Sequence, residues 1–441
     1  MRYRLAFLSL IVVVAGLGVR SPPASAHLKL VSASPERQST TQHAPGELRL
    51  VFDEPPILGI GRVAIIGSDG RNLAAGAPRL DPDDQAQVVV PLRAAGAGAY
   101  TVHWQMLGDD GHIVRSAYSF GIRHPPGPPQ PAPGSGPGLG ADALRWLYFI
   151  ALSLTGGGLV FEAVVLEPIL RRQPAAARDR RLRRRSLALA GVAAVVALHL
   201  DLYAYVEWTH EVVGGNWSSF SNADVRSLWS LAPIGRAWRW TTVSWIAVLA
   251  LIGVAALRPA RRGLFAGAAG LLALATSLGL SLSGHSAAAS GAISLPTAAD
   301  YLHLLAAAVW VGGIAWLAII VLPAGQSDDA EPDVPVRACL ARFSNLALVA
   351  VAVLVAAGGY LALVRLERPS DLVTGYGALL LAKTLVALAA IGIGAFHRST
   401  LRPQLAAGRT PSLARTIQLE LALISAALLL AAILATTAPP T

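Results

Sequence analysis

The sequence contains a single cysteine, Cys339, among 441 residues. One cysteine excludes a disulfide framework, a Cys-x-x-Cys metal site and an iron–sulfur cluster within one chain. Methionine is equally scarce, and only Met106 lies beyond the first residue, which excludes a methionine-rich cuprous site. Charged residues make up 14% of the chain and hydrophobic residues 54%. This composition excludes a soluble single-domain enzyme and is typical of a membrane protein that carries a soluble module.

The net charge of +10 comes mostly from arginine, because Lys29 and Lys383 are the only lysines. Residues 171–185 hold eight arginines, and the segments 258–262 and 397–415 are also rich in arginine. If eight helices alternate in direction, these three loops lie on one side of a bilayer, and basic short loops are typical of the cytoplasmic side. We therefore attribute the charge to membrane topology and expect no nucleic-acid partner.

Eight apolar stretches occupy the second part of the chain, each near the ~20 residues that a helix needs to cross a bilayer. We predict helices near 143–166, 186–206, 241–257, 263–283, 299–322, 343–363, 377–396 and 416–437. Residues 142–437 are therefore expected to form an all-α polytopic membrane domain of eight transmembrane helices, followed by a short tail at 438–441. The expected location is the cytoplasmic (inner) membrane.

The N-terminus has the pattern of a signal peptide. Arg2 and Arg4 precede an apolar run over 5–19, and Ala24 and Ala26 form an A-x-A cleavage site. We predict a signal peptide over 1–26, so that the mature chain begins at His27. An N-terminal histidine offers an amine and an imidazole nitrogen, a chelating pair suited to Cu(II). The alternative is that His27 is merely the residue that follows the cleavage site.

Residues 27–124 contain short alternating apolar runs separated by turn sequences such as Ser68-Asp69-Gly70. This spacing predicts an all-β sandwich on the periplasmic or extracellular side of the membrane. The following segment, 125–141, is almost entirely proline and glycine, and is expected to be a linker.

Asp110 and His112 stand two apart in the sequence Asp110-Gly111-His112. In extended chain, residues at i and i+2 project to one face, so the two side chains can converge on one ion. An isolated Asp-Gly-His usually marks only a turn. Together with His27, however, it gives nitrogen and oxygen ligands that Cu(II) favours.

The segments Tyr100-Thr-Val-His-Trp104, Asp110-Gly-His112 and Ser116-x-Tyr-Ser-Phe120, with His27 after Ala-x-Ala, resemble the copper-binding protein family CopC. The resemblance covers nearly all of 27–124 and implies a cupredoxin-like sandwich that binds Cu(II) through His27, Asp110 and His112. The remaining histidines of this segment match no ligand position and are expected to be surface or packing residues; they are His43, His103 and His124.

The membrane half contains a second informative run. Gly284-His285-Ser286 precedes the fifth apolar stretch, and Asp300 and His303 lie at its beginning. Polar residues at membrane depth are costly unless they pair or coordinate something. By the predicted topology, His285 and His303 lie near the outer surface on neighbouring helices. His199, at the outer end of the second helix, is a third candidate copper ligand.

Three glutamates lie in the inner half of the membrane domain: Glu162, Glu167 and Glu420. They could form an exit or proton path, but we expect them to meet the arginines of the loops.

The run from Gly284 to Gly313, with Arg342-Phe-Ser344, Tyr376-Gly377 and Lys383, resembles the copper-resistance membrane protein family CopD over roughly 142–437. Fused CopC and CopD modules occur in that family, so each resemblance supports the other. The family's usual Asn-Arg after the seventh helix reads His397-Arg398 here, which leaves the role of His397 open.

We therefore expect Cu(II) capture by the β domain and copper import through histidine sites in the membrane domain, with the bilayer and an unidentified copper acceptor as partners. No nucleotide-binding motif is visible, so ATP-driven transport is not expected, and the chain is not expected to be an enzyme. Two alternatives stay open. One is a b-haem membrane oxidoreductase or cupric reductase with His199, His285 and His303 as axial ligands. The other is a copper buffer or sensor that does not transport.

Overall fold

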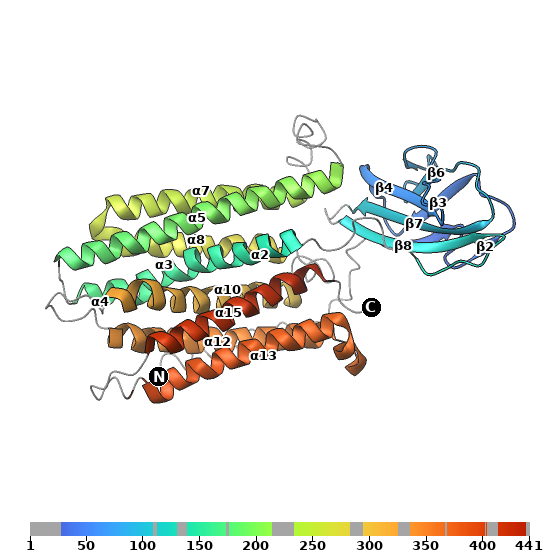
Figure 1. Ribbon diagram of the computed structural model, residues 1–441. Coiled ribbons are helices and arrows are strands. Elements are labelled where there is room, and N and C mark those ends of the chain that lie inside the picture. The colour runs from blue at the N-terminus through green and yellow to red at the C-terminus, as the bar shows by residue number, and fades with distance from the viewer. Residues whose placement is uncertain are drawn as a thin grey trace.

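The protein consists of a β domain and a bundle of long helices in the computed structural model (Figure 1). The structure describes residues 28–108, 113–129, 139–172, 176–213, 233–282, 294–324, 336–366, 368–401, 403 and 413–437. The β domain lies beyond the end of the bundle at which the first helix, α2, begins (Figure 1). The predicted order, a β sandwich followed by an all-α membrane domain, is confirmed.

The β domain is built from two four-stranded sheets. One has the order β1-β3-β6-β5 and the other the order β2-β8-β7-β4. Every pairing is antiparallel except the short contact between β2 and β8. The strands are β1 (Leu30–Ser34), β2 (Thr40–Thr41), β3 (Glu47–Phe52), β4 (Ile57–Gly67), β5 (Arg79–Leu80), β6 (Gln87–Pro91), β7 (Gly98–Leu107) and β8 (Ile113–Ile122).

The core of the sandwich follows from alternation along its strands. In β7, Val102, Trp104 and Met106 are buried, while His103 lies on the opposite face. Trp104 meets Phe52 of the other sheet edge to face, with ring centroids 5.2 Å apart. This core contains no residue of the helices, so the β domain has the apolar interior that independent folding requires.

Eight helical segments of the described chain are long and apolar enough to cross a membrane, which confirms the predicted number. The first span combines α2 (Leu139–Leu152), η1 (Ser153–Gly157), α3 (Gly158–Phe161), η2 (Glu162–Leu166) and α4 (Glu167–Leu170). The next three are α5 (Ala176–Val213), α7 (Pro233–Leu257) and α8 (Arg262–Leu282), with η4 (Pro259–Arg261) between the last two. The fifth span is α10 (Leu295–Trp316), continued by η5 (Leu317–Val321) and α11 (Leu322–Ala324), and the sixth is α12 (Val336–Arg365). The short helix η6 (Pro369–Val373) precedes the seventh span, which is α13 (Gly375–Phe396) continued by η7 (His397–Leu401). The eighth span is α15 (Leu413–Thr436).

Glycines allow α10 to approach the first span at backbone distance. A Cβ atom on Gly312 would overlap the carbonyl oxygen of Ser153, and one on Gly157 would overlap that of Ala308. The adjacent Gly313 similarly makes room for a ring of α12. Small residues are the usual means of close helix packing in membranes, where apolar lipid gives no hydrophobic drive for association. The Gly312-Gly313 pair of the sequence is therefore a packing feature.

Candidate metal centres

The start of the described chain is fixed on the β sandwich. Leu28 is 1% exposed and belongs to the core. The Lys29 amide donates to Asp53 Oδ1 at 2.7 Å, and the Asp53 amide donates to the Lys29 carbonyl oxygen at 3.0 Å. A buried leucine and two backbone contacts therefore hold the residues that directly follow His27, which itself lies outside the described residues.

Strand register brings this start to the end of the sandwich at which β7 ends. Leu30 pairs with Phe52 at the end of β3, and the next strand begins at Ile57, which pairs with Leu107 at the end of β7. The end of β7 therefore lies at the same end of the sandwich as the start of β1. Asp110 and His112 lie between β7 and β8 in the sequence, outside the described residues, as His27 does, so the convergence of these three residues stays a prediction.

The other histidines of the β domain are at its surface or in packing positions. His43 and His124 are exposed, and His103 is half-buried on the outer face of β7. Desolvation lowers the pKa of His103 below its ordinary value. Met106 is fully buried in the core, and its sulfur lies against Gly61.

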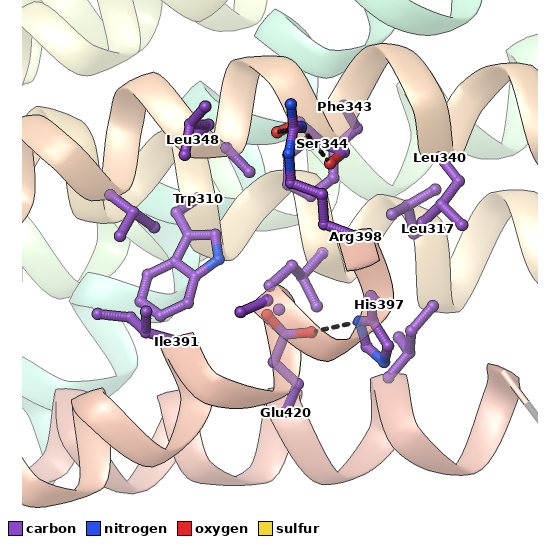
Figure 2. A pocket seen from close by; sticks show the side chains of 16 residues that line it. Trp310, Leu317, Leu340, Phe343, Ser344, Leu348, Ile391, His397, Arg398 and Glu420 are labelled. Carbon is purple, nitrogen blue, oxygen red and sulfur yellow. Dashed lines mark hydrogen bonds and ion pairs between the residues drawn. The ribbon is translucent and has the colours of Figure 1, made fainter. Parts of the chain in front are cut away.

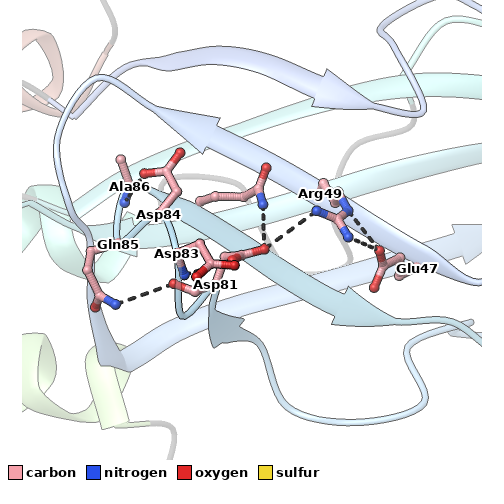
Figure 3. Close-up of polar contacts among 8 residues, drawn as sticks. Glu47, Arg49, Asp81, Asp83, Asp84, Gln85 and Ala86 are labelled. Carbon is pink, nitrogen blue, oxygen red and sulfur yellow. Dashed lines mark hydrogen bonds and ion pairs between the residues drawn. The ribbon is translucent and has the colours of Figure 1, made fainter.

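The acidic segment after β5 is held by hydrogen bonds and ion pairs within the β domain (Figure 3). Asp81 accepts from the Asp83 amide at 3.0 Å and from Gln87 Nε2 at 2.7 Å. Arg49 lies 3.5 Å from Asp81 and also pairs with Glu47. The hydrogen bond from the Asp83 amide is the main cause of the lowered pKa of Asp81. These carboxylates stabilise a turn and its neighbouring strand.

His303 of α10 lies against a glycine of α12. Its Nδ1 is 3.0 Å from the carbonyl oxygen of Leu354, and a Cβ on Gly358 would come within 2.7 Å of the ring. A carbonyl oxygen only accepts hydrogen bonds, so Nδ1 is a protonated nitrogen, and in the neutral ring Nε2 then has the lone pair. A backbone carbonyl that fixes the tautomer in this way is the usual second partner of a metal-binding histidine. Sequence inspection had no means of finding the roles of Leu354 and Gly358.

A cluster of charged side chains surrounds this end of α10. Asp300 lies 3.7 Å from Arg365, and Arg365 donates to the hydroxyl of Tyr376 at 3.3 Å. Lys383 is near enough for its charge to act on both Asp300 and His303. The cluster therefore contains two cationic side chains and one carboxylate, so it does not concentrate cations. A copper ion held at His303 would depend on the ligand bond more than on Coulomb attraction.

His199 and His303 have different surroundings. His199 is exposed on α5 and its Nδ1 contacts the carbonyl oxygen of Val195 in the same helix at 2.8 Å. Two residues on, Asp201 is buried and accepts from the hydroxyl of Thr241 at 3.0 Å. The carboxylate, rather than the imidazole, therefore faces the interior. His285 lies outside the described residues, so the predicted pairing of His285 with His303 stays a prediction.

Within the described residues, no group of three or more His, Cys, Asp or Glu side chains is arranged to hold a metal ion. The arrangement also gives no support to a haem held between His199 and His303, since the first is turned outward and the second contacts α12.

The glutamates of the first span meet arginines, as expected from the sequence. Glu167 lies 2.9 Å from Arg171 and 3.0 Å from Arg183. Glu162 is 3.4 Å from Arg262 and accepts from Ser186 Oγ at 2.6 Å. These pairs join α4, η2, α5 and α8 at the arginine-rich end of the bundle.

Comparison with known proteins agrees with this division of the chain. The CopC domain family matches residues 30–123, the copper resistance protein D-like N-terminal domain matches 137–295, and copper resistance protein D matches 337–434. The chain is therefore a CopC domain fused to a CopD-like membrane domain, and a multi-pass membrane protein.

Among individual proteins, the chain is homologous to the copper transport protein CutJ of Bacillus subtilis (strain 168). The two are 27% identical over 425 residues, which cover 94% of this chain and 75% of the relative. Protein YobA of Escherichia coli (strain K12) is 29% identical over 124 residues, 28% of this chain and 94% of that protein. The crystal structure of CopC from Methylosinus trichosporium OB3b is 25% identical, with a TM-score of 0.21, and covers 22% of this chain and 93% of that one.

Proposed function

We propose that this protein captures Cu(II) on its β domain and moves copper through the helical bundle into the cytoplasm. One observation carries the proposal. A single chain joins a CopC domain to a CopD-like bundle of eight spans, and it is similar along 94% of its length to a copper transport protein. A short proline-rich linker thereby joins a copper-binding domain to a membrane pathway. The linker keeps the β domain, as the copper donor, at a high local concentration.

Capture is assigned to His27, Asp110 and His112. The amine and imidazole of His27, the imidazole of His112 and the carboxylate of Asp110 provide a nitrogen and oxygen ligand set that suits tetragonal Cu(II). Leu28 and the Lys29–Asp53 contact support this assignment, because they hold the backbone beside residue 27 at the end of the sandwich where β7 ends at Leu107. Signal cleavage before His27 is required, since an amide nitrogen in a longer chain lacks the basic lone pair of the amine.

Transit through the membrane is assigned to His303, with His285 and His199 as further candidates. His303 offers one free nitrogen in a fixed tautomer. The neighbouring cations Arg365 and Lys383 act against long residence of a cation. A pathway ligand has to release its ion, so this balance is suited to transit rather than storage.

The proposed inward direction rests on an orientation inferred from the charge of the loops and on the membrane potential. The arginine-rich end of the bundle corresponds to the cytoplasm by the positive-inside rule. Each positive charge that moves inward then gains ~2.3 kcal/mol per about 100 mV of membrane potential. An unidentified acceptor on the cytoplasmic side would complete the transfer.

The test is copper uptake into proteoliposomes that contain the full-length protein. We expect uptake above that of protein-free vesicles, a large loss in His303→Ala and His285→Ala, and no loss in His43→Ala, a control at an exposed position. Binding without uptake would replace the transporter by a copper buffer. Uptake that is unchanged in His303→Ala would remove this residue from the pathway, and a Soret band in the purified protein would favour the haem alternative.

A further inference from the structure

A cavity of ≈ 160 Å³ lies among α10, α12, α13 with η7, and α15 (Figure 2). Most of its lining is apolar, with Trp310 on one side and Phe343 on another. The polar side chains that line it are Ser344, His397, Arg398 and Glu420. His397 and Arg398 begin both η7 and the arginine-rich segment 397–415, so the cavity belongs to that end of the bundle.

His397 and Glu420 face each other beside this cavity (Figure 2). His397 Nδ1 lies 3.1 Å from Glu420 Oε2, and the two residues are 7% and 2% exposed. The other ring nitrogen, Nε2, lies 2.8 Å from Thr416 Oγ1. Thr416 Oγ1 in turn lies 3.0 Å from the carbonyl oxygen of Leu413. The four groups form a continuous chain of hydrogen bonds between η7 and α15.

The positions of the heavy atoms do not fix the number of protons in this series of hydrogen bonds. A hydroxyl has one proton to donate. If Thr416 donates to Leu413, its oxygen accepts from His397 Nε2, and the ring carries protons on both nitrogens beside the Glu420 carboxylate. If Thr416 instead turns and donates to Nε2, the ring is neutral and Nδ1 alone donates to Glu420. The same heavy atoms therefore accommodate two states that differ by one proton.

The neighbouring arginines are directed away from the His397–Glu420 pair or are exposed. Arg398 Nη1 donates to the carbonyl oxygen and hydroxyl of Ser344, at 3.1 and 2.8 Å, and to Asn345 Oδ1 at 3.1 Å. Its guanidinium is thus directed to α12 and away from Glu420 (Figure 2). Among the described residues that line the cavity, α10, η5 and α12 contribute no titratable group, and Arg415 of α15 is exposed.

We propose that His397 and Glu420 form a proton-binding dyad that takes up and releases one proton through the cavity at the arginine-rich end. On release, the proton on His397 Nε2 passes to solvent in the cavity, the Thr416 hydroxyl rotates to donate to Nε2, and Glu420 keeps its charge. On uptake, these movements reverse. The dyad provides the membrane domain with a proton to exchange as copper moves; this coupling rests on the proposed transport, whereas the proton binding does not.

Proton binding is tested by nitrogen NMR of the full-length protein, labelled with ¹⁵N-histidine, in lipid nanodiscs. His397→Gln identifies the signal by its loss. We expect the two ring nitrogens of His397 to change from a doubly protonated to a singly protonated pattern as the pH is raised across the range in which the protein stays folded. Glu420→Gln should leave the ring neutral over that range, and Thr416→Val should change the population of the two states while retaining the fold. A His397 signal that keeps one pattern at every pH and in Glu420→Gln would overturn the proposal.

Coupling is tested with copper ions and a pH dye inside proteoliposomes. We expect the pH change that accompanies copper uptake to be lost in His397→Gln, while Ser399→Ala, an exposed position of η7, behaves as the native protein. Native copper uptake with an identical pH change in His397→Gln would refute the coupling. Absence of copper uptake in the native protein would refute the proposed transport, and the NMR titration would still decide whether the dyad binds a proton.

Discussion

Glu162 and Arg262 provide a direct test of whether the inner carboxylates stabilise the bundle or carry ions. Glu162 is completely buried and Arg262 is 7% exposed. They lie 3.4 Å apart, and Ser186 donates to Glu162 while also accepting from Trp316 Nε1 at 2.9 Å. Removal of the carboxylate in Glu162→Ala leaves the buried guanidinium of Arg262 without its paired carboxylate, and the carbonyl oxygen of Arg183 remains as an acceptor. Loss of one partner of a buried ion pair costs about 3–5 kcal/mol, so we expect a loss of stability of this size.

A double variant distinguishes the ion pair from its surroundings. Glu162→Leu combined with Arg262→Met removes both charges and retains apolar volume, and replacement of a complete buried pair is often nearly neutral. We therefore expect the double variant to be more stable than Glu162→Ala, with strong coupling in the double-mutant cycle built from Glu162→Leu and Arg262→Met. Unfolding in mixed detergent micelles, followed by far-ultraviolet circular dichroism, gives the free energies. If Glu162→Ala retains native stability but loses copper uptake, the structural reasoning is refuted and Glu162 belongs to the transport path.

Three further predictions concern other parts of the chain. One residue added before His27, or Asp110→Ala, should weaken Cu(II) binding by the β domain strongly, and unchanged affinity in a competition titration would remove the assigned site. Because burial lowers the pKa of His103, the unfolded chain binds more protons, and the stability of the β domain should fall as the pH drops through about 6.5. His103→Gln should reduce that fall in urea unfolding measured at two pH values, and an identical pH dependence would contradict it. Gly312→Val should destabilise the bundle by about 1–3 kcal/mol or more through overlap with Ser153, measured as a lower unfolding midpoint than that of Gly359→Ala, whose added Cβ meets open space.

Much of the architecture could be predicted because its causes are local in sequence. Long apolar stretches determine the spans, and alternation with turn sequences determines the sandwich. The expectation that the inner glutamates meet arginines was correct for Glu162 and Glu167. It was wrong for Glu420, which pairs with His397.

The details of the membrane sites depend on which helix faces meet, and periodicity gives no information on this. Arg365 lies far from Asp300 in sequence, yet the two pair across α10 and α12. Similarly, the sequence left the role of His397 open, and only helix packing brings it to Glu420. His199 was predicted to be a candidate ligand, whereas the structure exposes His199 and buries Asp201, because the rotation of a helix that is apolar on all sides is set by its neighbours.

The glycine contacts of α10 limit how the bundle can move. Where backbone meets backbone, at Gly157 and Gly312, there is no side chain whose rotation could take up a displacement. The first span and α10 therefore behave as one rigid body, and α10 lies between the two matched membrane segments, 137–295 and 337–434. Any opening and closing of a pathway is then expected on the other face of α10. Movement of α12, α13 and α15 against this rigid body would change the shape of the cavity that they share with it.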